Sequence, residues 1–374
     1  MSPDGSSSAL EAGRACDQEP IHIPGSIQPH GHLLAMAPRS IQLTHVSAQA
    51  GAILTVPIEA AFGRPLDAVL DCATARALCD ALQRLPPSGP VQLGCVRMNS
   101  GTAFHAIGHR SPDGSCILEF ESVETAGSEA PATLEALYPG VRDAFGRLGR
   151  AASVQDLADG TAAEVRRITE FDRVLVYRFE ENWDGTVIAE DNGTRLPSYL
   201  GLRFPASDIP AQARRLYELN PQRLIADVDY APVPILARSP APPLDLTFAS
   251  LRSVSPVHLE YMRNMGTPAS FSISIQRGDG QLWGLVSCHH AEPRRISHAA
   301  RNACDLVAQM FAVRVAAREE MAHVEERARL TGLEGRLLAR MTSTERFEDG
   351  LLAAPGDLLA LTGAASSPSS KRSV

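Results

Sequence analysis

The chain has 374 residues, of which 44% are hydrophobic and 21% charged, and its formal net charge at pH 7 is −8. This length indicates two or three domains, and an acidic balance without a basic patch argues against a nucleic-acid partner. No apolar run approaches the roughly 20 residues that span a bilayer, and residues 1–15 lack the charged and apolar regions of a signal peptide. We therefore expect a cytoplasmic globular protein that does not bind a membrane.

Seven cysteines are scattered along the chain without a CxxC motif, so the sequence indicates neither a disulfide framework nor a zinc site. Most of them are expected to be buried thiols. Cys16 differs, because it follows the polar segment 1–14 and stands in the polar stretch ACDQEP. A thiol on a flexible arm can reach a ligand held by another domain, and its thiolate is a good nucleophile toward an activated vinyl group.

Residues 21–122 show the pattern of a small antiparallel domain. The stretch IHIPGSIQPHGHLLA (21–35) places His22, His30 and His32 near Cys16, which raises a metal site, but its prolines and glycines indicate more simply a loop that enters a strand. The pattern predicts strands at 41–47, 90–98, 103–110 and 115–122, a turn at 111–114 and a helix at 73–85. A five-stranded antiparallel sheet with short helices is the economical assembly.

The polar stretch 123–135 marks a domain boundary. Beyond it the sequence predicts a helix at 141–150 and a second helix that begins at Ser153, whose hydroxyl can cap it. Strands are expected at 173–179 and 186–190, joined by the turn NWDG. Two helices followed by antiparallel strands predict a second α+β domain.

The stretch GLRFPASDIPAQARRLY (201–217) sets Asp208 between two prolines, Pro205 and Pro210. Proline fixes its own φ and disfavours the helical region for the residue before it, so a rigid, largely non-helical bend is expected here. Such a bend can present both its backbone and the Asp208 side chain to a ligand. The alternative is that Asp208 caps the helix that starts near Pro210.

Residues 227–255 contain five prolines, and we expect little regular structure there. A loop of this length is unusual in a compact domain unless it has a function. The helical stretch 253–266 then places His258 and Tyr261 on one face. In the strand SFSISI (270–275), alternation puts Ser270, Ser272 and Ser274 on one side. These hydroxyls either face a carboxylate-bearing ligand or form a solvent-facing strand edge. The last strand, 281–290, ends in His289 and His290, which are expected to be exposed.

From residue 296 to about 341 the sequence predicts one long helix, because apolar residues recur at spacings of three and four. Gly332 and Gly335 weaken it locally. A seam of small and medium apolar residues continues beyond the domain and predicts a parallel homodimer through this helix. The seam consists of Met310, Ala317, Met321 and Val324.

Three long motifs occur in order: CDQEPIHIPGSIQPHGHLLA, PASDIP and LRSVSPVHLEYMRNMG. Together they resemble the chromophore-binding region of bacterial phytochromes, from about Cys16 to Gly363. The resemblance implies an α+β fold with a flexible segment (1–20), a PAS domain (21–128), a GAF domain (129–318), and a helical spine with an incomplete PHY start (319–374). It also implies a figure-of-eight knot, with Ile27 at the crossing with the 227–255 loop.

The resemblance further implies a red/far-red photoreceptor that is not an enzyme, apart from autocatalytic attachment of biliverdin to Cys16 through a thioether, and that has no kinase domain in this chain. Arg223 and Arg252 are expected to pair with one propionate, and Ser270, Ser272 and His258 with the other. Asp208 and His258 would hold the pyrrole nitrogens. Tyr177, Phe204 and Tyr261 would pack around the outermost ring, and His289 would bond its carbonyl. The expected set also contains Ile209, Tyr217 and Ser255.

Two other functions remain open. A light-independent PAS-GAF module could bind a small ligand such as a cyclic nucleotide, although Cys16 and PASDIP argue against it. A Cys/His hydrolase is the other possibility, but the sequence shows no nucleophile elbow and no paired base.

Overall fold

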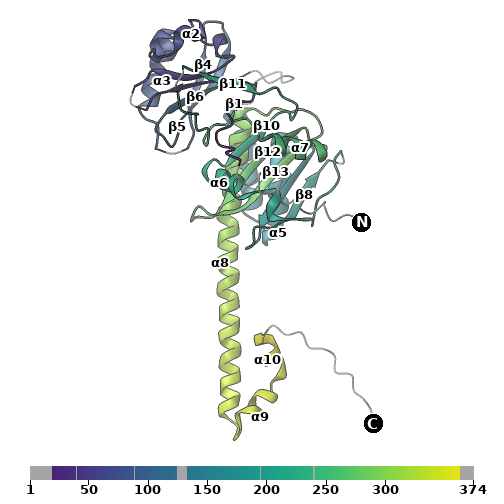
Figure 1. Cartoon of the computed structure of the whole chain (residues 1–374). Helices are drawn as coiled ribbons and strands as arrows, with labels where there is room; N and C mark the ends of the chain where they lie inside the picture. The colour runs from purple at the N-terminus through teal and green to yellow at the C-terminus, as the bar shows by residue number, and fades with distance from the viewer. Residues whose placement is uncertain are drawn as a thin grey trace, which may run out of the picture. The chain divides into compact units, whose positions relative to one another are not determined.

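The structure, a computed structural model, describes residues 19–38, 40–87, 89–123, 133–193, 195–238 and 241–362. The chain divides into two compact units, Met1–Val313 and Arg314–Val374. The first unit contains two antiparallel sheets, drawn in Figure 1. None of the helices in the described part of the chain is long and apolar enough to cross a membrane.

The first sheet has seven strands. In spatial order they are β1 (Ser26–Ile27), β11 (Val233–Ala237), β3 (Leu43–Ser47), β2 (Gly31–Met36), β6 (Cys116–Ser122), β5 (Ala103–Arg110) and β4 (Val91–Arg97). Strands β2, β3, β4, β5 and β6, which follow one another in the sequence, form the predicted five-stranded antiparallel sheet. Two further strands, β1 and β11, extend it beyond β3.

Strand β11 corrects the prediction that residues 227–255 have little regular structure. It pairs with β1 on one side and β3 on the other. Val233 and Ile235 pack against a core cluster that includes Ile27. Pro234 stands between them and obscured this alternation in the sequence. A segment of the second domain therefore completes the sheet of the first.

Short helices cover the main core of this sheet: η1 (Ala50–Ala52), α2 (Ile58–Ala61), η2 (Leu66–Ala68) and α3 (Cys72–Leu82). The predicted helix at 73–85 corresponds to α3, whose first turn is capped because Asp71 accepts a hydrogen bond from the Thr74 N–H. The β6 residues Leu118 and Phe120 lie in this core, whereas Ile117 points to a second cluster on the opposite face.

The second sheet has six antiparallel strands. In spatial order they are β10 (Gln222–Ile225), β12 (Ala269–Gln276), β13 (Leu282–His290), β7 (Arg173–Phe179), β8 (Gly185–Asn192) and β9 (Arg203–Phe204). Helices α4 (Leu134–Leu148) and α5 (Val154–Thr169) precede it. Ser153 caps α5 as predicted, through a reciprocal bond pair with Asp156. Helix α4 begins earlier than predicted, because Thr133 caps it ahead of Pro139.

Three shorter elements belong to the same part of the chain: η3 (Ala206–Asp208), α6 (Ala211–Leu219) and α7 (Pro256–Asn264). Figure 1 shows α6 and α7 beside strands β10, β12 and β13. One open alternative and one expectation, both of exposure, were wrong. Strand β12 lies between β10 and β13, so Ser270, Ser272 and Ser274 do not form a solvent-facing edge. His289 and His290 are buried, because β13 lies inside the sheet.

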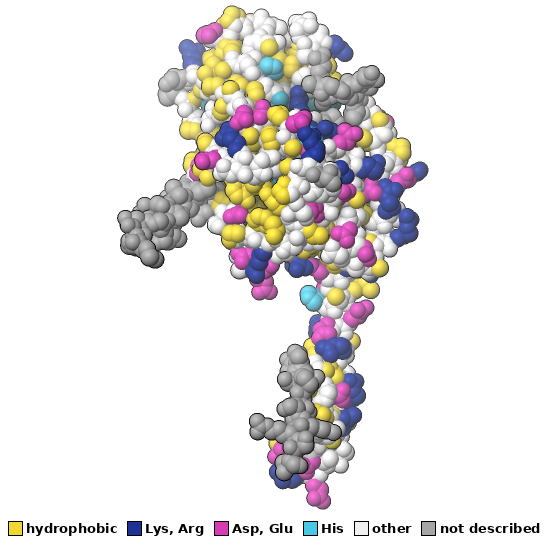
Figure 2. Space-filling model, turned by 90° about the vertical axis from the view of Figure 1, so that its right-hand side faces the viewer, with side chains coloured by type: hydrophobic (Ala, Val, Ile, Leu, Met, Phe, Trp, Pro, Cys, Tyr) yellow, Lys and Arg dark blue, Asp and Glu magenta, His cyan; other side chains and the backbone are white. Residues whose placement is uncertain are grey.

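The long helix is α8 (His298–Thr342), as predicted, and Gly332 and Gly335 do not interrupt it. In the first unit, its Phe311 packs edge-on against Trp283 of β13. Helices α9 (Phe347–Leu352) and α10 (Pro355–Thr362) follow. Met321 and Val324 of the proposed dimer seam are each 55% exposed. Figure 2 shows hydrophobic side chains among charged ones on the second unit.

The expectation that most cysteines are buried was wrong for several of them. Among the described cysteines, Cys288 and Cys304 are buried, Cys79 and Cys116 are partly buried, and Cys72 and Cys95 are exposed. Cys72 is the first residue of α3 and Cys95 lies on the edge strand β4, positions that local periodicity did not reveal.

Candidate functional site

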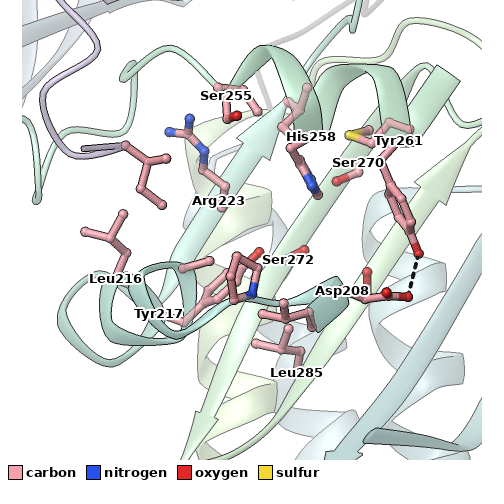
Figure 3. A pocket seen from close by; sticks show the side chains of 18 of the residues that line it. Asp208, Leu216, Tyr217, Arg223, Ser255, His258, Tyr261, Ser270, Ser272 and Leu285 are labelled. Carbon is pink, nitrogen blue, oxygen red and sulfur yellow. Dashed lines mark hydrogen bonds between the residues drawn. The ribbon is translucent and has the colours of Figure 1, made fainter. Parts of the chain in front are cut away.

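A cavity of about 330 Å³ is lined by the second sheet, η3, α6 and α7. All the predicted site residues that the structure describes line it, and Figure 3 shows ten of its residues by label. They are Tyr177, Phe204, Asp208, Ile209, Tyr217, Arg223, Arg252, Ser255, His258, Tyr261, Ser270, Ser272 and His289. Cys16 lies outside the described residues. The structure thus gathers residues from positions 177 to 289 around one space.

Strand β12 delivers hydroxyl groups to the cavity. Ser270 and Ser272 line it, whereas Ser274 donates to the Tyr217 carbonyl at 2.8 Å. The polar face of the strand therefore divides into a part that faces the cavity and a part that anchors the end of α6.

Two arginines place positive charge at the cavity. Arg223 Nη2 donates to the Arg252 carbonyl at 2.5 Å, while its buried Nη1 has no partner within the described part of the chain. Arg252 donates to backbone carbonyls of Leu246 and Thr247. Among the described residues neither guanidinium forms an ion pair. Burial lowers the pKa of Arg223, and burial together with Arg223 lowers that of Arg252 to about 9. Such a pair of cations favours an anionic ligand, for which a carboxylate has the matching geometry.

Asp208 points toward the cavity instead of capping α6. Helix α6 starts after Pro210 with no side-chain cap, so the capping alternative was wrong. The Tyr261 hydroxyl donates to Asp208 Oδ2 at 3.4 Å, a long and therefore weak hydrogen bond, drawn dashed in Figure 3. Burial raises the pKa of Asp208, and the Tyr261 bond opposes this rise.

The bend that carries Asp208 is held by residues that the sequence analysis missed. Arg214 Nη1 donates to the carbonyls of Ala206 at 3.1 Å and Ile209 at 2.5 Å, on either side of Asp208. The Arg214 guanidinium lies 4.8 Å above the Trp183 ring. Asp184 accepts a bond from the Ala206 N–H at 3.0 Å. The only sequence signal was the basic character of the run after PASDIP.

His289 has a defined tautomer. Its Nδ1 accepts hydrogen bonds from the Arg173 guanidinium, at 2.9 Å from Nη2, and arginine has no acceptor. Burial, with a further contribution from Arg173, lowers the pKa of His289 to about 3, so the ring is neutral at pH 7. Its proton is then on Nε2, which lies 3.1 Å from Ser287 Oγ. His289 is therefore a hydrogen-bond donor at the cavity.

His258 lies on the α7 wall, with its ring stacked on Tyr261 at a centroid distance of 6.1 Å. Burial and, to a smaller extent, the charge of Arg223 lower the pKa of His258. The ring is therefore neutral at pH 7 and can both donate and accept a hydrogen bond.

Aromatic rings form one end of the cavity. Tyr177 packs edge-on against Phe179 at 5.2 Å and lies 6.2 Å from Phe204. Gly185 allows this arrangement, because a Cβ at that position would lie 1.9 Å from Tyr177 Cζ. Burial raises the pKa of Tyr177, which keeps its hydroxyl protonated.

The N-terminal segment also reaches the cavity, through two residues that the sequence analysis did not name as site residues. Glu19 and Ile21 line it, and Ser255 Oγ donates to Glu19 Oε2 at 2.6 Å. The sequence feature that could have indicated this contact is the position of Glu19, three residues after Cys16.

The comparisons with known families agree with this architecture. Residues 16–123 match the family described as PAS fold, and residues 153–318 match the GAF domain. Cyanobacterial phytochrome B of Nostoc is 40% identical over 342 residues, which are 90% of this chain and 45% of that protein. A bacteriophytochrome of Xanthomonas campestris is 38% identical over 90% of this chain and 52% of its own length. The chain spans about half the length of these curated relatives.

Solved structures show the same relationship. The photosensory core module of Stigmatella aurantiaca phytochrome is 40% identical with a TM-score of 0.81, covering 93% of this chain and 69% of that one. The chromophore-binding domain of a bacteriophytochrome from R. palustris is 42% identical with a TM-score of 0.72, covering 82% of this chain and 99% of that one. The resemblance seen in the sequence is confirmed: the chain belongs to the phytochrome family and contains the PAS-GAF chromophore-binding region of a bacteriophytochrome.

Proposed function

We propose that this chain is a red/far-red photoreceptor that holds biliverdin and is attached to it through a thioether at Cys16. The observation that carries the proposal is the pair of guanidinium groups, Arg223 and Arg252, that lack an ion-pair partner among the described residues. Biliverdin has two propionates, four ring nitrogens and an extended apolar framework. A cavity with cations, hydroxyls and aromatic walls suits such a molecule.

The residues of the cavity divide by chemistry. Arg223 and Arg252 would hold one propionate; Ser270, Ser272 and His258 would hold the other. The Asp208 backbone and His258 would bond the pyrrole nitrogens. The remaining residues would enclose the pigment: Tyr177, Phe204, Ile209, Tyr217, Ser255 and Tyr261 line the cavity, and His289 would donate from Nε2 to the carbonyl of the outermost ring.

When bound, the bilin supplies a double bond that isomerises on absorbing light. Tyr261 and Asp208 lie next to each other, and their 3.4 Å bond is weak enough for each group to exchange it for another partner. The bend that carries Asp208 is fixed by Arg214 and Asp184, so the change in hydrogen bonding occurs at a defined position. This exchange passes the light signal from the cavity to the protein.

Covalent attachment at Cys16 is supported by chain geometry. Glu19 is anchored at the cavity by Ser255, and three residues of extended chain span about 10 Å. A segment of that length is long enough for a thiol at position 16 to meet a ligand in the cavity. The Cys16 thiolate would add to a vinyl group of the bilin, and the proton it had released would return to the adjacent carbon.

We also propose that the family's knot is present. The segment with Ile27 pairs with β11 through β1, and Ile27 forms a bridge with Arg252. The Gln28 N–H donates to the Leu251 carbonyl at 2.7 Å, and the Ser253 N–H to the Ser26 carbonyl at 3.1 Å. Contacts on both sides of this segment support its passage through the 227–255 loop.

The test is to mix the protein with biliverdin, record the absorption spectrum, and run the denatured sample on a gel stained with zinc. We expect a new red band and a fluorescent protein band, whereas Cys16→Ser should give the red band and lose pigment on denaturation. If the mixture keeps the spectrum of free biliverdin, the proposal is wrong and the light-independent ligand module becomes the better account.

A further inference from the structure

A buried carboxylate of the PAS sheet contacts the backbone that leads into the cavity. Glu119, on β6, is fully buried. Its Oε1 accepts a hydrogen bond from the Ser250 N–H at 3.1 Å, and its Oε2 accepts one from the Leu251 N–H at 2.7 Å. Ser250 and Leu251 immediately precede Arg252, so both bonds act on the approach to a cavity residue.

Few other groups stabilise the buried Glu119 carboxylate. The nearest titratable partner within the described ranges is His109 of β5, whose Nδ1 lies 3.7 Å from Oε1. Burial lowers the pKa of His109 to about 3, so this ring is neutral and supplies no cation. Burial raises the pKa of Glu119 to about 7, and the two backbone N–H groups oppose that rise. The carboxylate therefore depends on the 250–251 backbone for its hydrogen bonds.

The fixed backbone determines where two cations lie. The carbonyl of Arg252 accepts the bond from Arg223 Nη2, so the position of one arginine sets that of the other. When Glu119 is ionised, its charge also raises the pKa of both arginines slightly, against the effect of burial. Glu119 thus acts on the cationic pair through the backbone and through its charge.

The neighbouring Glu121 provides an internal contrast. Glu119 and Glu121 share one face of β6, opposite the core residues Leu118 and Phe120. Both carboxylates are buried. Glu121, however, bonds to Arg301 of α8 and makes no bond to the 250–251 backbone among the described residues. The two acids therefore share residue type, strand and face but have different partners.

We infer that Glu119 is a positioning residue of the PAS domain, which holds Arg252 and, through it, Arg223 in place for the anionic groups of the ligand. This inference rests on the proposed function for the identity of that ligand. It assigns to the PAS sheet a part in forming a site whose walls come mostly from the GAF domain.

The first test needs no pigment. Hydrogen–deuterium exchange is measured on peptides that cover residues 244–253 in the protein without biliverdin. Glu119→Gln keeps one acceptor oxygen and replaces the other by an NH2 group, which donates and cannot accept, so exchange at 250–251 should become about tenfold faster or more. The matched control Glu121→Gln should leave this exchange rate unchanged. Equal rates in wild type and Glu119→Gln, or equal acceleration in both variants, would overturn the inference.

The second test measures biliverdin affinity by absorbance titration in a Cys16→Ser background, in which binding is reversible. We expect Glu119→Gln to weaken binding about tenfold and Glu121→Gln to change it less than about twofold. Unchanged affinity in Glu119→Gln contradicts the positioning role, even if exchange is faster. If wild type binds no biliverdin, the proposed function fails, and the exchange experiment still decides whether Glu119 holds the backbone.

Where Glu119→Gln does not fold, as judged by circular dichroism, Glu119→Asp replaces it in both experiments. Aspartate keeps the charge but shortens the side chain by one methylene, so exchange and affinity should lie between wild type and the loss expected for glutamine. A variant that matches wild type in both measurements would refute the role of the two hydrogen bonds.

Discussion

Replacing Arg223 by methionine removes a guanidinium from the cavity while keeping much of the side-chain volume. Arg223 Nη1 is buried and has no partner in the described structure, so it is free to donate to a ligand carboxylate. A hydrogen bond to a charged group contributes about 1.5–3 kcal/mol. This corresponds to a loss of affinity for biliverdin of about 10- to 150-fold.

The assay compares two ligands, biliverdin and its dimethyl ester, by absorbance titration in the Cys16→Ser background. Because the ester lacks the carboxylate charges, Arg223→Met should weaken its binding less than about threefold. Arg215→Met is the matched control: Arg215 lies on α6, is largely exposed and pairs with Glu218. It should change neither affinity.

The result that refutes this reasoning is an equal loss of affinity for the acid and the ester in Arg223→Met. That outcome would mean that the substitution damages the cavity in general, and that Arg223 does not recognise a carboxylate. A loss in Arg215→Met as large as in Arg223→Met would point to a long-range effect of net charge instead.

Three other predictions concern the signal, the stability and the assembly of the chain. Asp208→His removes the carboxylate next to Tyr261, so photoconversion of the pigment-loaded protein should fall and its fluorescence rise; unchanged photoconversion contradicts a role in the signal. Arg301→Met leaves the buried Glu121 unpaired and should lower the free energy of unfolding by about 3–5 kcal/mol in urea denaturation, whereas adding Glu121→Gln should restore most of it. Met321→Glu should convert a homodimer into a monomer in light scattering, and a wild-type mass that stays monomeric at all concentrations rules the dimer out.

The Glu121–Arg301 pair also predicts a pH dependence. Burial alone would raise the pKa of Glu121, but Arg301, together with His30 and His298, outweighs burial and lowers the pKa to about 2. The unfolded-state pKa is near 4.5, so the contribution to stability is present above that pH and is lost as the pH falls toward 2. Urea denaturation between pH 3 and pH 6 should show a smaller slope with pH in Glu121→Gln than in wild type.

Local patterns in the sequence were sufficient for much of the secondary structure. Ser153 predicted the start of α5, and the strand boundaries of β5 and β7 agree with alternation read from the sequence. Strand β11 was missed because Pro234 masks its alternation. The burial of His289 was missed because it depends on β13 lying inside the sheet, which a single strand does not reveal.

The candidate site, like the fold, was predicted only in part from the sequence. The assignment of residues to the cavity came mainly from the resemblance to a known family, whereas periodicity showed only that Ser270 and Ser272 share a strand face and that His258 and Tyr261 share a helix face. Glu119 could not be found in this way, because its partners Ser250 and Leu251 are more than 130 residues away in the chain. Arg214 was visible only as one of several basic residues after PASDIP, since its bonds to the bend require the folded backbone.

The central claim is that light reversibly changes a bilin held in this cavity. The most direct measurement is a difference spectrum of the pigment-loaded chain, recorded after red light and again after far-red light. The account predicts that red light bleaches the red band with a gain at longer wavelength, and that far-red light reverses both changes. A bound pigment whose spectrum is the same before and after both illuminations would contradict it.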